Sequence, residues 1–251
     1  ERAAGVVTVT LNRPERLNAV TVEMWPQLAE IFGEIGRTVE DRVMVVTGAG
    51  GAFSSGADVS GMGEGGSGSP LAHMREVADA ALALHRMPKP SVARVDGVAA
   101  GAGLNLALGC DLIVASDRSR FSEIFARRGL SVDFGGSWLL PRLIGLHRAK
   151  ELVLLADMLS ADEAKEVGLV NRVVPAAELD SLVADWAARL AAGPPLALSM
   201  SKLLLNKSLE SSLDQALEAE AQAQSVNLAS ADVREAVVAF MEKRTPVFEG
   251  R

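Results

Sequence analysis

Two glycine-rich turns and one carboxylate are the parts of this sequence whose residue types and spacing could do chemistry. The first turn, "GAGGAFSSGAD", covers residues 48–58 and follows the apolar run "VMVV", and the second, "GVAAGAG", covers residues 97–103. Small residues let a ligand approach the backbone, whose N–H groups are fixed hydrogen-bond donors. The carboxylate is Asp133 in "GLSVDFGGSW", which could accept and return a proton.

A dinucleotide site is one interpretation of these turns, because the second has the G-x-x-x-G-x-G spacing of short-chain dehydrogenases. That fingerprint belongs to the first βαβ unit and opens a long helix, whereas this turn lies in the third unit and opens a short one. The acid that such dehydrogenases use is tyrosine, which this sequence lacks. The first turn begins a G-x-G-x-x-G pattern that fails at Phe53. For either turn alone, glycines that merely permit a tight bend or close packing remain an alternative.

Composition excludes several classes of function. A chain of 251 residues that is 49% apolar can bury a full core, as one large domain or one domain with an appendage. The net charge of −7 opposes general attraction to nucleic acid or an anionic membrane. One cysteine and three scattered histidines predict neither a disulfide nor a metal site. There is no membrane-spanning run and no basic-then-apolar leader, so we expect a cytoplasmic protein.

Strands and helices alternate through the first half of the chain, which indicates an α/β fold. Continuous apolar strands predict a sheet that is covered on both faces. Thr21 is the expected N-cap of the first helix, and the glycine-rich stretch 60–70 is expected to form a mobile loop. The predicted strands cover 5–12, 41–48, 91–97 and 111–116, and the predicted helices cover 21–37, 71–87 and 102–109.

From about residue 137 the pattern becomes helical, with "VNRVVP" as the one expected strand. Ser160 and Glu163 have the spacing of a capping box, and either Ser230 or Asp232 is expected to cap the last helix. The last third of the chain is therefore predicted to be a helical layer.

Taken together, the two turns resemble those of the enoyl-CoA hydratase/isomerase family, the crotonase superfamily. The segments "VTVTLNRPERLNAV", "LLPRLIGLHRAKELVLLADMLSADEAKEVGLVNRVV" and "REAVVAFMEKRTPVFEG" are similar to that family too, in the right order over essentially the whole chain. The resemblance implies a spiral of ββα repeats over residues 1–190, which holds an acyl-CoA site. Residues 191–251 would then form a C-terminal helical region that assembles the protein as a homotrimer or a dimer of trimers.

The family's chemistry starts from an acyl-CoA thioester, whose carbonyl oxygen gains negative charge during the reaction. By the family's motif, the N–H groups of Ser55 and Ala102 would donate to this oxygen and form an oxyanion hole. Related enzymes often have glycine at the position of Ala102, so the pocket is expected to be slightly tighter here. No cofactor is expected beyond the coenzyme A that the substrate carries.

The same resemblance indicates where the coenzyme A arm lies. Ser55, Gly56, Ala57 and Asp58 would follow the arm, with Asp58 in a structural role at the turn. The pantetheine and adenine would follow a segment that includes Arg13, Arg16, Leu17 and Ala19. The basic residues proposed for the phosphates, with ordinary surface charge as the alternative, are Arg13, Arg16, Lys89, Lys243 and Arg244.

Hydratases of the family use two glutamates, and this chain lacks both. The first position is occupied by Asn105, whose amide cannot take a proton, and the second by Phe125. Glu123, two residues upstream of Phe125, could substitute if the local backbone shifts. The missing carboxylates make simple hydration the less favoured activity.

Asp133 lies in a motif that resembles 3,2-enoyl-CoA isomerases and the ring-epoxide isomerases of phenylacetate breakdown, where this aspartate is the acid/base. Asn105 would orient the substrate or help to position Asp133. An apolar wall of Phe125, Phe134 and Trp138 would raise the basicity of Asp133. The alternative is that Asp133 is an N-cap of a helix beginning near Gly135.

The sequence therefore predicts an acyl-CoA isomerase, with acyl-CoA as its partner and neither nucleic acid nor membrane. The alternatives are an enoyl-CoA hydratase and a non-catalytic acyl-CoA-binding member of the family.

Overall fold

The computed structural model of this protein describes residues 1–60 and 69–251. Most of the predicted mobile loop over 60–70 lies outside the described residues.

The main sheet is parallel apart from one edge pair. Its strand order is β1-β2-β3-β4-β6-β9, and β1 pairs with β2 antiparallel. The central strand β3 is buried at its first four residues, as its continuous apolar run predicts. The strands are β1 (Arg2–Ala3), β2 (Val6–Leu11), β3 (Val43–Gly48), β4 (Ser91–Val95), β6 (Leu112–Ser116) and β9 (Arg172–Val174).

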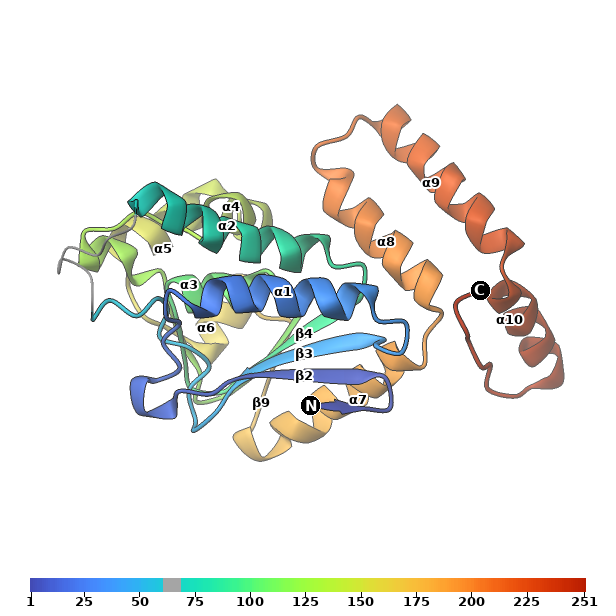
Figure 1. The fold of residues 1–251 in the computed structure, drawn as a ribbon, viewed down its shortest axis with the longest axis horizontal. Coiled ribbons are helices and arrows are strands. Elements are labelled where there is room, and N and C mark those ends of the chain that lie inside the picture. The colour runs from blue at the N-terminus through green and yellow to red at the C-terminus, as the bar shows by residue number, and fades with distance from the viewer. Residues whose placement is uncertain (61–68) are drawn as a thin grey trace.

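Helices cover both faces of this sheet. Helices α1 (Met24–Arg37) and α2 (Pro70–Arg86) lie on one face, and α7 (Leu179–Ala191) lies on the other (Figure 1). Successive residues of a strand point to opposite faces. Thus Met44 and Val46 join the core cluster that includes α1 and α2, while Val43 and Val45 pack with α7.

A second line of short strands runs beside the main sheet. It contains β5 (Val98–Ala100), β7 (Arg120–Ser122) and β8 (Leu159–Ser160), and single bridges extend it from Ser54 to Ala99 and from Val20 to Ala57. A long strand, a short extended segment and a helix thus recur along the chain. The predicted spiral of ββα repeats is confirmed.

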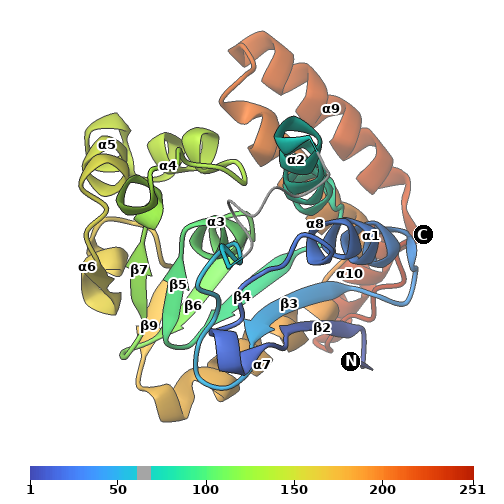
Figure 2. The same cartoon turned by 60° about the vertical axis from the view of Figure 1, so that its left-hand side comes forward.

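The remaining helices complete the molecule. Figure 2 shows α5 and α6 beside β7, on the side of the molecule away from the C-terminal helices. Helix α3 follows β5 and lies in the interior, with all its residues buried. The bounds are α3 (Ala102–Leu108), α4 (Gly136–Ile144), α5 (Leu146–Leu155), α6 (Ala161–Glu166), α8 (Pro195–Ser208), α9 (Leu213–Ala229) and α10 (Ala231–Glu242), with 3-10 turns η1 (Pro14–Arg16), η2 (Ile124–Arg128) and η3 (Ala176–Glu178).

Two of the predicted caps are confirmed and one is wrong. Ser160 and Glu163 form the capping box of α6, and Ser230 rather than Asp232 caps α10. The predicted N-cap Thr21 lies in a turn before α1. The single β-bridge at Val20 keeps the chain extended up to the residue directly before Thr21, so the helix does not begin there. In the part of the chain described here, no helix is both long and apolar enough to cross a bilayer.

Candidate active site

The two glycine-rich turns meet at the second line of strands. The Ala100 N–H donates to the Ser54 carbonyl at 2.9 Å. A Cβ at Gly56 would lie 2.8 Å from the Ala100 carbonyl oxygen, and one at Gly103 would lie 2.6 Å from the Ser54 carbonyl oxygen. Glycine is required at both positions because any side chain would separate the turns.

The predicted donor role of the Ser55 N–H is wrong, because this group donates to the Leu17 carbonyl at 2.9 Å. The Gly56 N–H donates to the Ser54 hydroxyl at 3.2 Å. The N–H of Ala57, in contrast, has no hydrogen-bond partner among the described residues. The sequence alone could not show whether Ser55 or Ala57 has the free N–H. The direction of each N–H depends on the turn at Gly56, whose φ is 98°.

Ala102 provides a second free N–H close to the first turn. It is the first residue of α3, and its N–H has no partner within the described residues, as expected for the first turn of a helix. Its nitrogen lies 3.4 Å from the position that a Cβ on Gly56 would occupy. The two turns therefore bring a pair of unpaired backbone donors, at Ala57 and Ala102, to neighbouring positions.

Three polar residues from separate elements meet at α3. The Asn105 amide Nδ2 donates to the Asp133 backbone carbonyl at 3.0 Å and to Glu123 Oε2 at 3.3 Å. A carbonyl oxygen only accepts, so the nitrogen of the amide must face Asp133. Asn105 thus links the loop before α4 to Glu123, which directly precedes η2.

Burial changes the proton affinity of both carboxyl groups. Burial raises the pKa of Asp133 to about 6. Burial also raises the pKa of Glu123 to about 8; the charge of Asp133 adds to this shift, and the hydrogen bond from Asn105 opposes it. At neutral pH Asp133 is mostly ionised and Glu123 is protonated.

Each of the three side chains has a buried oxygen without a hydrogen-bond partner. These atoms are Asn105 Oδ1, Glu123 Oε1 and Asp133 Oδ1 within the described structure. Buried polar atoms in this condition are uncommon and often occur where a site is completed by a ligand or a proton transfer. In the sequence, Asp133 and Asn105 lie in a recognisable motif, whereas Glu123 was only an alternative.

The alternative role of Asp133 as a helix N-cap is wrong. Helix α4 begins at Gly136, and its N-cap is Gly135, which has a φ of 81° and makes no side-chain cap. A Cβ at Gly136 would lie 2.5 Å from Asn105 Nδ2, so this glycine lets α4 begin directly against the amide. The backbone around Asp133 is therefore fixed by Asn105 and Gly136.

The three predicted aromatic residues lie in different surroundings. Phe125 is buried, with its ring 3.6 Å from the position of a Cβ on Gly101. The ring of Phe134 packs on Trp25 at a centroid distance of 5.4 Å. Trp138 lines a cleft on the α8 side together with Phe134, and Phe125 does not line that cleft, so the three rings do not form one wall.

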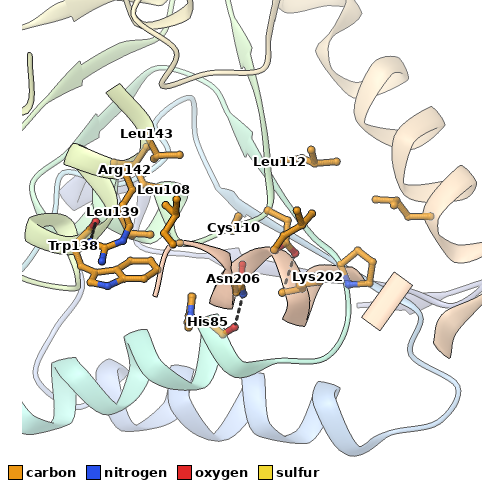
Figure 3. Close-up of a pocket in the computed structure, with 16 residues that line it drawn as sticks. His85, Leu108, Cys110, Leu112, Trp138, Leu139, Arg142, Leu143, Lys202 and Asn206 are labelled. Carbon is orange, nitrogen blue, oxygen red and sulfur yellow. Dashed lines mark hydrogen bonds and ion pairs between the residues drawn. The ribbon is translucent and has the colours of Figure 1, made fainter. Parts of the chain in front are cut away.

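This cleft lies between α2, α4 and α8. One cavity of about 600 Å³ begins at Phe134 and Gly135, directly after Asp133, and includes Trp138. A second cavity of about 470 Å³ adjoins it and shares His85, Trp138 and Asn206 (Figure 3). The Trp138 indole donates to Glu210 at 3.1 Å and its ring lies 4.0 Å below the Arg142 guanidinium.

Of the residues predicted along the coenzyme A arm, Arg13 and Asp58 form a structural pair. Arg13 Nη1 lies 2.9 Å from Asp58 Oδ2 and donates to the Ala19 carbonyl at 2.8 Å. Hydrogen bonds from Ser60, and then from Arg13, lower the pKa of Asp58 to about 2. Asp58 therefore anchors the turn, and Arg13 is occupied by protein partners.

The neighbouring residues Arg16 and Leu17 are exposed, whereas Ala19 is buried. Leu17 adopts a left-handed φ of 49° and is 50% exposed. The backbone and side chains of Arg16 and Leu17 are therefore accessible to a ligand that binds at the first turn.

Two of the other proposed phosphate ligands have structural partners. Lys89 donates to the backbone carbonyls of Thr38 and Asp41. Arg244 pairs with Glu235 at 2.6 Å. Both groups already have partners, whereas Lys243 is exposed at the end of α10.

A family model described as "Enoyl-CoA hydratase/isomerase" matches residues 1–251. The 1,2-epoxyphenylacetyl-CoA isomerase of Escherichia coli K12 is 39% identical over 251 residues, which cover 98% of this chain and 96% of the relative. The short-chain-enoyl-CoA hydratase of Clostridium acetobutylicum is 34% identical over 247 residues, covering 97% and 94%. A solved enoyl-CoA hydratase from Bacillus anthracis has a TM-score of 0.94 and 31% identity, covering 98% of this chain and 96% of that one. Isomerases and hydratases thus occur at similar identity.

Proposed function

Since the chain belongs to the enoyl-CoA hydratase/isomerase family, we propose that it is an acyl-CoA isomerase. It would move a double bond of an enoyl-CoA thioester from the 3 to the 2 position, or act on a related ring substrate. The observation that supports this most is the position of Asp133, a partly buried carboxyl group with a pKa of about 6. The two positions of the hydratase glutamates hold Asn105 and Phe125 instead.

The thioester oxygen would accept hydrogen bonds from the free N–H groups of Ala57 and Ala102. These donors are fixed by the fold, so they need no rearrangement when the oxygen gains charge. One such donor contributes on the order of 3 kcal/mol to lowering a barrier. Ala57 takes the donor role first assigned to Ser55, since the Ser55 N–H is already bonded to Leu17.

The ionised Asp133 would remove a proton from the α carbon of a 3-enoyl thioester. The electron pair of that C–H bond delocalises into a dienolate, whose oxygen carries the negative charge between the two donors. Asp133 then returns the same proton to the γ carbon, and the double bond comes to lie next to the thioester. One carboxyl group suffices for both steps, and Asn105 would hold it in place through the Asp133 backbone.

The substrate would enter along the first turn. Its coenzyme A arm would follow the exposed segment at Arg16 and Leu17 and the turn residues Ser55 and Gly56, with no further cofactor. The acyl group would extend into the cleft that begins at Phe134 and Gly135, whose volume of about 600 Å³ has room for a chain or a ring. Trp138 and Phe134 would contact it in this cleft, and Phe125 would contact its reacting end beside Gly101.

Hydration is the second candidate, and one observation favours it. Glu123 lies against Asn105 rather than in solvent, so the site holds two carboxyl groups with separated pKa values of about 6 and about 8. A hydratase needs one group to activate water and another to deliver a proton.

A comparison of two substrates separates these functions. The protein is incubated with 2-enoyl-CoA and with 3-enoyl-CoA, and the products are separated by chromatography. Conversion of the 3-enoyl to the 2-enoyl isomer supports the proposal. A 3-hydroxyacyl product from 2-enoyl-CoA identifies a hydratase, and binding of either ester without turnover contradicts both enzymes.

We also propose that the enzyme is a cytoplasmic homotrimer or dimer of trimers. The site-bearing spiral would occupy residues 1–190, and residues 191–251 would supply the assembly surface. This proposal rests on the exposed apolar side chains of α8 to α10, among them Leu205, Phe240 and Met241.

A further inference from the structure

We propose that Glu123 is a positioning residue for the proposed isomerisation. It is a neutral carboxyl group that holds Asn105 in place and leaves Asp133 as the single negative charge of the site. The inference rests on the proposed role of Asp133 as the base, and it assigns to Glu123 no contact with the substrate.

The geometry of Glu123 is that of a carboxyl group enclosed by protein. Its side chain is 0% exposed, and it lies between β7 and η2, facing the α3 residue Asn105. Oε2 accepts the amide proton of Asn105 at 3.3 Å, and Oε1 has no partner among the described residues. Without a cation at either oxygen, an ionised carboxylate here would be strongly destabilised.

The surrounding elements supply no compensating positive charge. Helix α3 and strand β5 carry no ionisable residue. The ionisable residues of α6, between 162 and 166, are exposed. The ionisable residues of β7, η2 and α5 are exposed as well; these are Arg120, Arg127, Arg128, His147, Arg148, Lys150 and Glu151.

Asp133 is the one charged group that acts on the pKa of Glu123, and it raises that pKa further. Two like charges that share a buried site cannot both ionise at neutral pH, so one proton stays on the pair. Glu123 is the more deeply buried of the two groups, so this proton resides on it and Asp133 carries the charge.

This arrangement suits a reaction that creates an anion. A charged Glu123 would repel the dienolate and would favour the protonated, inactive form of Asp133. The neutral acid avoids both effects and still accepts the Asn105 amide hydrogen bond, which an apolar residue could not do. Glu123 gives up no proton during the cycle.

Infrared difference spectroscopy tests the protonation of Glu123 without any substrate. The carboxylic acid C=O band is followed during a pH titration of the wild-type protein, Glu123→Gln and Asp133→Asn. We expect a band at pH 7 that disappears around the Glu123 pKa of about 8. It is absent from Glu123→Gln, and in Asp133→Asn its midpoint moves to lower pH because the neighbouring charge is gone.

Two infrared results would overturn the inference. One is a wild-type spectrum at pH 7 that matches that of Glu123→Gln, which would mean that Glu123 is ionised. The other is an unchanged midpoint in Asp133→Asn, which would mean that the two groups are not coupled. Neither result depends on turnover, so a failure of the proposed isomerase function would be seen separately.

The pH dependence of kcat and KM with 3-enoyl-CoA supplies the second test. Wild-type kcat should rise through the Asp133 pKa of about 6 and fall through the Glu123 pKa of about 8. Glu123→Gln should keep the rise and lose the fall, so that its kcat relative to wild type increases about tenfold per pH unit above the fall. KM should follow the same course in both proteins.

Exposed Glu151→Gln on α5 is the matched control and should keep the wild-type profile, with circular dichroism at each pH confirming the fold. A falling limb that persists in Glu123→Gln would contradict the positioning role, since a merely structural glutamate would leave the profile unchanged.

Discussion

Asp133 gains its basicity from burial rather than from a charged partner. Burial is the cause of its raised pKa of about 6, and its carboxyl Oδ1 has no hydrogen-bond donor in the described structure. A carboxylate with good donors would be stabilised as an anion and would be a poorer base. The residue is held by its backbone, through Asn105, so its side chain stays free for chemistry.

The assignment of the backbone donors can be tested at Ala57. Ala57→Pro removes an N–H that has no partner in the described protein, so it breaks no hydrogen bond of the fold. We expect kcat/KM for 3-enoyl-CoA to fall about 10²- to 10³-fold, the usual effect of losing one oxyanion donor. Steady-state kinetics measures this, with thermal unfolding as the check on folding.

Ser55→Ala is the control for this prediction. The Ser55 hydroxyl donates to the Arg16 carbonyl at 3.2 Å, and the substitution leaves every backbone N–H in place. Its kcat/KM should stay within about threefold of wild type, because the Ser55 hydroxyl is bonded to the protein and the coenzyme A arm would follow the backbone of the turn. An unchanged kcat/KM in Ala57→Pro would show that the donor assignment is wrong.

Glu123 also makes stability depend on pH. Its folded-state pKa of about 8 lies above its ordinary value of 4.5, so the folded protein binds more protons than the unfolded chain in this window. The free energy of unfolding should therefore decrease as pH rises from 6 to 8, by up to about 1.4 kcal/mol per pH unit. Glu123→Gln should flatten this slope in urea unfolding at several pH values; an equal slope in both proteins would show that Glu123 is ionised in the folded state.

The sequence identified Asp133 and Asn105 because each lies in a local motif. It did not establish Glu123, since whether that side chain points inward depends on the short strand β7 and the turn η2 around it. The error at Ser55 has a similar origin, because the turn at Gly56 decides which N–H is free. The sequence was enough to identify the residue types of the site. The directions of the side chains and N–H groups could be assigned only from the backbone conformation.

At the scale of elements, contact between the first turn and α3 decides whether the two donors stay together. A Cβ at Gly103 would lie 2.6 Å from the Ser54 carbonyl oxygen and 2.7 Å from its Cβ. The strand at Ser54 and the helix α3 are therefore packed backbone to backbone.

Gly103→Ala should push α3 away from this strand. We expect a loss of about 1–3 kcal/mol in the free energy of unfolding, because overpacking of this kind forces the backbone to move. kcat/KM should decrease more than the loss of stability explains, since the Ala102 N–H moves with the helix. Denaturant unfolding and kinetics on the same variant measure the two effects.

Gly33→Ala provides the comparison inside α1. Its added Cβ would meet only the flexible end of Arg37, at 3.1 Å, and alanine is the better helix former. This variant should be stabilised by about 0.5–1 kcal/mol with normal activity. Equal changes in stability and kcat/KM in Gly103→Ala and Gly33→Ala would contradict the claim that the close contact at Gly103 positions α3.

The main strands and helices were predictable because their apolar patterns extend over five or more residues. The three-residue strand β9 was predicted from the apolar residues of "VNRVVP", but β5, β7 and β8 were missed, since two or three residues are too few to show an alternation. Their pairing comes instead from the spiral, which brings segments from different repeats into register. These short strands nevertheless hold the site, because β5 leads into α3 and β7 leads to Glu123.

At the scale of the whole molecule, the C-terminal helices differ from the rest. Helices α8 and α9 contain no fully buried residue, whereas the sheet and α3 are densely packed. Figure 1 shows α8, α9 and α10 to one side of the sheet. The proposed assembly surface on these helices therefore consists of exposed apolar side chains.

Phe240 is 82% exposed on α10 and provides the direct test of this assembly. Phe240→Glu places a charge in the proposed subunit contact, which costs several kcal/mol if the position becomes buried. We expect sedimentation velocity to show a trimer or hexamer for the wild-type protein and smaller species for the variant. A wild-type monomer, or a variant of unchanged mass, would contradict the proposed assembly surface.

The central claim is that Asp133 isomerises an enoyl-CoA thioester, and the rate of 2-enoyl-CoA formation from 3-enoyl-CoA tests it most directly. The rate is measured for the wild-type protein, for Asp133→Asn and for Asp162→Asn, which changes an exposed aspartate on α6. We expect Asp133→Asn to reduce kcat about 10²- to 10⁴-fold with the fold intact, and Asp162→Asn to match wild type. Turnover by Asp133→Asn at the wild-type rate would contradict the account.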